Sequence, residues 1–199
     1  MKRKIVESGP DPTDNLLRLQ RFFEEVNATH ICKKCAICSS VIQKPVIDIK
    51  NAILNDVDVL IISETASEED IEYHIPFIGV TGMYFRKALY EAGVSKYSVV
   101  LTNAVVCRAK DVSNMNRIPT LLELNNCSDR IKVFIETLRP KKICLVGTVA
   151  AKFYTKKLSE GGIKLPIHII HHPAYVIRMG NKDFYKIWVK NIRKVFRSK

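Results

Sequence analysis

Four cysteines have the residue type and spacing of a metal-binding site. Cys32 and Cys35 form a C-x-x-C pair, Cys107 and Cys127 each stand alone far downstream, and Cys38 is a possible fifth ligand. Four thiolates can hold either a zinc ion or a [4Fe–4S] cluster. Zinc sites more often combine two close pairs, and the spacing alone leaves both centres open.

Four short apolar runs lead into segments that carry polar residues of catalytic types. The runs cover 57–63, 97–103, 142–147 and 167–171. Short, nearly unbroken apolar runs are typical of strands in a parallel sheet that is covered on both faces. Cys144 lies inside one run, so we expect it to be a core residue rather than a ligand.

Helical patterns alternate with these strands. Apolar residues recur at helical spacing over about 13–27, 80–93, 119–138, 148–158 and 181–197. Alternating strands and helices predict an α/β fold with three layers, α/β/α, around a central, mostly parallel four-stranded sheet.

The fold class predicts where a ligand would bind. In doubly wound sheets, ligands bind at the carboxyl ends of the strands. This rule selects the loop after Ser63, Asn103 and the residues that follow it, the loop after Gly147, and residues 171–173.

Composition indicates a polyanionic partner such as nucleic acid. The chain has 199 residues, 47% of them apolar, and a formal net charge of +12. Such a charge favours nucleic acid, although an ordinary lysine-rich protein is the alternative. We expect a disordered lead over 1–12 and a single domain over 13–199.

The N-terminal residues do not resemble a secretory signal. Residues 1–4 are basic (Met-Lys-Arg-Lys), but the positions where an apolar stretch would be needed hold Glu7, Gly9, Pro10, Asp11 and Pro12. We therefore expect a monomer without a membrane partner, cytoplasmic or otherwise intracellular, and nuclear if the source is eukaryotic or a virus that replicates in a nucleus. Cysteines in such compartments more often serve metal binding or catalysis than disulfides.

Motifs at the predicted strand ends occur in an order that resembles a known family. The matching segments are 63–82, 102–108, 116–119, Cys127, 145–151 and 172–175. They resemble the family 4 uracil-DNA glycosylases, which are iron–sulfur proteins. The resemblance implies that Cys32, Cys35, Cys107 and Cys127 hold a structural [4Fe–4S] cluster, and that Cys38 is not a ligand.

The resemblance also assigns residues that recognise a base flipped out of DNA. Phe77 would stack on the pyrimidine, Asn103 would pair with uracil O4 and N3–H, and His172 would donate to uracil O2. The alternatives are a core phenylalanine, a strand-end asparagine, and a structural or phosphate-binding histidine. A metal site that includes His168 and His171 is a weaker alternative, because strand alternation separates His171 from His172.

Two acids and an amide would hold and polarise the attacking water. The resemblance assigns this role to Glu64, Glu69 and Asn116, because the sugar develops an oxocarbenium-like centre that a carboxylate can stabilise. The alternative for residues 68–70 is a solvated helix start.

Further residues would contact DNA. Tyr175, Val176 or Ile177 could enter the minor groove as a wedge. Arg108, Lys110 and Arg178 are expected phosphate contacts.

The chain departs from the family pattern in its first loop. The family has Gly-Glu-(Ala/Gly)-Pro-Gly where this chain has Ser63-Glu64-Thr65-Ala66-Ser67. The stretch between Cys107 and Asn116 is also longer than usual, and Asn125 replaces a lysine. Loss of the glycines puts the backbone of the pocket in question.

Two functions from different classes follow. The first is a monofunctional DNA repair glycosylase that hydrolyses the bond to uracil, or to a related modified pyrimidine, in single- or double-stranded DNA and leaves an abasic site. The second is a catalytically weak or inactive DNA-binding relative that acts as a replication or repair accessory. A zinc-bound nucleic-acid module is a third, weaker possibility.

Overall fold

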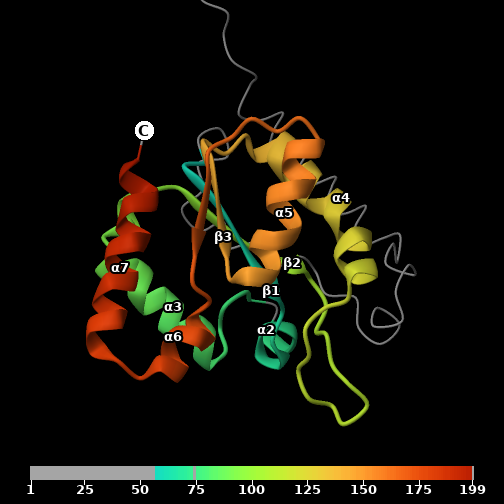
Figure 1. The fold of residues 1–199 in the computed structure, drawn as a ribbon, viewed down its shortest axis with the longest axis horizontal. Helices are drawn as coiled ribbons and strands as arrows, with labels where there is room; N and C mark the ends of the chain where they lie inside the picture. Colours follow the sequence, from blue (N-terminus) through green and yellow to red (C-terminus); the bar gives the residue numbers. More distant parts are fainter. Residues whose placement is uncertain (1–56, 74, 199) are drawn as a thin grey trace, which may run out of the picture.

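The computed structural model describes residues 57–73 and 75–198 (Figure 1). The expected lead over 1–12, the expected helix over 13–27, and the three cysteines Cys32, Cys35 and Cys38 lie outside the described residues.

Four strands form one parallel sheet in the order β2-β1-β3-β4. They are β1 (Val59–Thr65), β2 (Val99–Val105), β3 (Lys142–Val146) and β4 (Ile167–Ile170). The predicted four-stranded parallel sheet is confirmed. β1 and β2 each end two residues later than predicted, because Thr65 still pairs with Val105 although the apolar runs have ended.

Helices cover both faces of the sheet, as predicted (Figure 1). The long helices are α3 (Val80–Glu91), α4 (Leu121–Leu138), α5 (Thr148–Glu160) and α7 (Lys182–Arg197), and the short ones are α2 (Glu68–Tyr73), η2 (Val94–Lys96) and α6 (Pro173–Met179). None of the helices in the described part of the chain has the length and hydrophobicity needed to cross a lipid bilayer.

Side-chain alternation along the strands produces two cores. Leu60 and Ile62 pack with α4 and α5. Val59 and Ile61 pack with α3 and α7, in the same core as Cys144, which is 1% exposed. The prediction that Cys144 is a core residue is therefore confirmed, and burial raises the pKa of its thiol to about 12.

The strand order places a topological switch point between β1 and β3. From β1 the chain moves to β2 on one side, and it then crosses to β3 on the other. The carboxyl ends of all four strands share one edge, which carries α2 and α6 (Figure 1). Ligands of doubly wound sheets bind at such an edge.

Candidate active site

His172 stands at the carboxyl edge, two residues after β4, and caps α6. Its Nδ1 accepts a hydrogen bond from the Ala174 backbone N–H at 3.2 Å. Burial, with a contribution from the Arg178 charge, lowers the pKa of the half-buried imidazole to about 4. The ring is therefore neutral at pH 7, and because Nδ1 is an acceptor its proton resides on Nε2.

Gly147 lies in the turn between β3 and α5, next to the His172 side chain. The residue has φ +88°, and a Cβ there would lie 3.0 Å from the His172 Cβ. A glycine thus lets the turn between β3 and α5 lie against the imidazole. Sequence reasoning selected this loop but did not identify the contact, which depends on strand order.

Asn103 and Phe77 lie on the same side of the sheet. Asn103 is 7% exposed on β2, two residues before the strand ends rather than at its end as predicted. It is opposite Ser63 in the register and shares the α3/α7 side with Leu101 by strand alternation. Phe77 belongs to the core on that side, where its ring centroid lies 5.4 Å from that of Phe85.

The Phe77 backbone has a conformation that is rare for a bulky residue. Its φ is +59°. Arg86 of α3 donates from Nε to the Phe77 carbonyl at 3.0 Å and from Nη2 to the Pro76 carbonyl at 2.8 Å. A Cβ at Gly82 would lie 2.2 Å from the Phe77 carbonyl carbon, so glycine is required there.

Asp70 joins this segment to the first loop. Its carboxylate accepts from the backbone N–H groups of Ser67 and Ile78, at 3.2 and 2.9 Å. Sequence reasoning missed Asp70, Gly82 and Arg86 as supports of Phe77. No local pattern marks them, because each acts on a segment several residues away.

The two candidate acids have opposite electrostatic environments. Glu64, near the end of β1, is half-buried, and burial raises its pKa. Alternation places it on the α4/α5 side, opposite to Ser63 and Asn103. Glu69 lies in the first turn of α2, between Glu68 and Asp70. Its pKa is lowered by a hydrogen bond to its own backbone, by a hydrogen bond to Ser67 and by the charge of Arg108. The alternative of a solvated helix start thus describes Glu68 and Glu69, which are exposed, but not Asp70, which is 6% exposed.

Arg108 holds Asn116 in place. Its Nε donates to Asn116 Oδ1 at 2.7 Å, and its Nη1 pairs with Glu68 of α2 at 3.1 Å. With a side chain only 12% exposed, Arg108 is engaged by the protein. These contacts favour a positioning role over the phosphate contact expected from the sequence.

The altered first loop needs no glycine. Within residues 63–67, no φ is positive. Thr65 Oγ1 donates to the Cys107 carbonyl at 2.7 Å and accepts from the Ala109 N–H at 3.3 Å. The substitution therefore adds contacts that connect the first loop to the segment after β2.

Cys107 and Cys127 are the two cluster candidates among the described residues. They are 4% and 2% exposed and belong to the same core, to which Cys127 contributes from α4 and Cys107 from the segment after β2. Two buried thiols on one side of the sheet fit a soft-metal site that draws further ligands from elsewhere in the chain. No group of three metal-binding side chains occurs within 57–73 and 75–198.

The segment after His172 is a helix, not the loop expected from the sequence. Helix α6 has seven residues, a His172 cap and Pro173 at its start, too few for a periodic pattern. Tyr175 and Ile177 are 39% and 37% exposed, whereas Val176 is 1% exposed, so Val176 is not a wedge.

The histidines have different partners. The exposed His171 ring lies 5.2 Å from the Tyr175 ring, and His168 Nε2 lies 3.1 Å from Ser198 Oγ. Arg178 is exposed in the last turn of α6.

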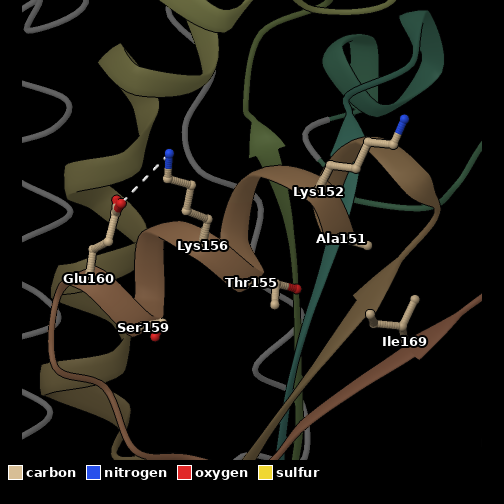
Figure 2. A pocket seen from close by; sticks show the side chains of 7 residues that line it. All are labelled: Ala151, Lys152, Thr155, Lys156, Ser159, Glu160 and Ile169. Atoms are coloured by element: carbon tan, nitrogen blue, oxygen red, sulfur yellow. Dashed lines mark ion pairs between the residues drawn. The ribbon is translucent and has the colours of Figure 1, made fainter.

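An open depression elsewhere on the surface contains none of these residues (Figure 2). It lies between α5 and the edge strand β4, and Lys156 and Glu160 form an ion pair at 3.7 Å beside it. Its lining residues are Ala151, Lys152, Thr155, Lys156, Ser159, Glu160 and Ile169. This depression therefore contains none of the candidate catalytic or base-binding side chains.

A comparison with solved structures supports the fold described above. A solution NMR structure of a Methanosarcina acetivorans protein, assigned as a uracil DNA glycosylase, has the same fold, with a TM-score of 0.50 and 17% identity over 71% of this chain and 94% of that one.

Curated relatives are similar over most of their length. The type-4 uracil-DNA glycosylase of Thermotoga maritima is 27% identical over 81% of this chain and 88% of its own. The type-4 enzyme of Saccharolobus solfataricus is 31% identical over 69% of each chain. The family model "Uracil DNA glycosylase superfamily" matches residues 52–193. The chain therefore belongs to the uracil DNA glycosylase superfamily, in its type-4 group.

Proposed function

We propose that the chain is a monofunctional uracil-DNA glycosylase, which hydrolyses the N-glycosidic bond of uracil, or of a related modified pyrimidine, flipped out of DNA. The observation that carries this proposal is the neutral His172, whose only proton-bearing ring nitrogen is Nε2. Such a group can donate a hydrogen bond from Nε2–H to uracil O2 as negative charge develops there.

Asn103 would recognise the base. A carboxamide offers a donor and an acceptor on one group, which complements O4 and N3–H of uracil and disfavours cytosine. Phe77, on the same side of the sheet, would place its aromatic ring against the flipped pyrimidine. Its rare backbone conformation, supported by α3, is the kind of strain that concentrates at functional sites.

The acids would act on the sugar and the water. As the C1′–N1 bond breaks, its electron pair moves to the base, and a water oxygen bonds to C1′. The Glu69 carboxylate, ionised because its pKa is lowered, would accept one proton of the water. Asn116, which Arg108 positions, would hold that water by a hydrogen bond. Glu64 would add negative charge near the sugar once its raised pKa is exceeded.

We also propose that Cys107 and Cys127, with Cys32 and Cys35, hold a [4Fe–4S] cluster. The burial of both described thiols in one core supports this assignment. Such a cluster would pin the segments next to the DNA surface. A purified chain with the cluster is brown, with a broad band near roughly 400 nm, whereas a zinc protein is colourless. Cys107→Ser should lose the band.

DNA is the proposed partner, and we infer a monomer that works inside the cell, where this substrate occurs. Tyr175 and Arg178 on α6 would contact the strand near the flipped nucleotide.

The test is excision of uracil from a labelled single-stranded oligonucleotide. We expect alkali-sensitive cleavage by the wild type and by Asn191→Ala, a matched substitution in the second half of α7, but not by Asn103→Ala. A folded, brown protein that binds DNA without cutting it would overturn the proposal and favour the accessory role.

A further inference from the structure

A β-hairpin-like segment, residues 108–117, projects from the carboxyl edge between β2 and α4. It contains an antiparallel bridge between Lys110 and Asn116. In Figure 1 it is the yellow-green segment that extends past α2, on the same edge of the molecule as α6. We refer to residues 108–117 as the hairpin.

The turn of the hairpin is internally hydrogen-bonded. Asp111 Oδ1 accepts from the backbone N–H groups of Ser113 and Met115, at 2.8 and 2.9 Å. The Asp111 N–H donates to the Met115 carbonyl at 2.9 Å, and Asn114 takes the left-handed conformation at φ +61°. The turn therefore has one defined shape.

Two arginines fasten the base of the hairpin to the rest of the site. Arg108 contacts Asn114 and Asn116 on one side and Glu68 of α2 on the other. Arg117 donates to the Lys110 carbonyl at 3.0 Å and forms a two-pronged pair with Glu123 of α4, at 2.6 and 2.9 Å. The hairpin is thus held at a fixed position relative to α2.

The tip of this braced turn presents apolar side chains to solvent. Val112 is fully exposed and Met115 is 65% exposed. Single exposed apolar residues are common, but here two stand together on a turn of fixed shape. Lys110 flanks them with a positive charge.

We propose that the hairpin is a second wedge, which places Val112 and Met115 against the base pairs beside the extruded nucleotide in duplex DNA. The inference rests on the proposed function. α6 and the hairpin stand at the same edge with α2 between them (Figure 1). Tyr175 and Ile177 would therefore contact the duplex on one side of the flipped base, and the hairpin would contact it on the other. Apolar side chains stabilise unstacked base steps in other DNA-bending proteins.

The test compares duplex and single-stranded substrates. The variant Val112→Ser/Met115→Ser keeps Asp111, Arg108 and Arg117, and both changes lie at exposed positions. We expect its kcat/KM on a uracil-containing duplex to fall about tenfold, because apolar contacts no longer offset unstacking. Excision from a single strand should be unchanged. Tyr90→Ser, at an exposed position of α3, is the matched control and should lose neither activity.

A fluorescent adenine analogue next to the uracil gives a second readout. Its fluorescence should rise when wild-type protein unstacks the duplex, and the rise should be absent with the double variant. Equal rates for variant and wild type on the duplex would refute the wedge, and so would equal losses on both substrates. A wild-type chain that cuts neither substrate would instead refute the proposed glycosylase.

Discussion

Replacing His172 by asparagine should make the free energy of unfolding less sensitive to acid. Asparagine is a good helix N-cap, so its side-chain oxygen can still accept from the Ala174 N–H, as Nδ1 of His172 does at 3.2 Å. The substitution therefore keeps the cap of α6 and removes the titrating group.

The sign and the size follow from the pKa of His172. That pKa is about 4 in the folded protein, against an ordinary value of 6.5. Between these values the unfolded chain binds more protons than the folded one, so the free energy of unfolding falls as the pH falls. The full shift corresponds to about 3 kcal/mol, and most of it should have been lost at about pH 4.5.

The assay is urea unfolding of wild type and His172→Asn at about pH 7.5 and pH 4.5. Between these conditions, the free energy of unfolding should fall by about 2 to 3 kcal/mol more for the wild type than for the variant. His168, whose pKa burial and Lys142 also lower, is present in both proteins and cancels from the comparison.

Two results would refute the reasoning. One is an identical acid dependence of wild type and variant. The other is a His172 proton resonance that titrates near its ordinary pKa of 6.5. Either would mean that burial does not lower the pKa of His172, so that the ring is partly protonated near neutral pH.

Three other substitutions test the supports of the site. Gly82→Ala should lower the melting temperature and abolish excision, because its Cβ would lie 2.2 Å from the Phe77 carbonyl carbon. Thr65→Val should destabilise by about 1–3 kcal/mol in urea, because the Cys107 carbonyl and the Ala109 N–H lose a partner. Glu123→Gln should cost about 1–3 kcal/mol at pH 7. Arg117 lowers the Glu123 pKa, so this difference should vanish as the pH falls through that pKa.

Each of these has a matched control. Met83→Ala changes an exposed neighbour of Gly82 and should be neutral. Thr65→Ser keeps the hydroxyl and should retain most of the stability. Glu136→Gln, in an exposed pair with Lys132 at 3.9 Å, should cost little at any pH. A control as damaging as its test variant would contradict the assigned contact.

The strands were predictable because their signal is local. The runs of β1, β2 and β3 are buried between the helical layers, and the run that contains Cys144 is the clearest case. The run of the edge strand β4 is buried less completely than predicted, with Ile169 59% exposed. The common edge at which Asn103, His172 and the first loop meet followed from the parallel topology alone.

The supports of the site were not predictable, because they depend on tertiary contacts. α6 is too short for periodicity to mark it. The demand for glycine at position 82 arises only because the Phe77 backbone crosses α3. Arg108 looks like any basic surface residue until Asn116 and Glu68 are placed beside it.

The contacts of Arg108 limit how this chain can change over evolution. One planar guanidinium serves the carboxylate of Glu68, the backbone and side chain of Asn114, and the amide of Asn116. A lysine would preserve the charge but would replace a rigid fork by a single point charge, which cannot serve all these partners at once. Drift at position 108 is therefore coupled to positions 68, 114 and 116, and the four should change together or not at all.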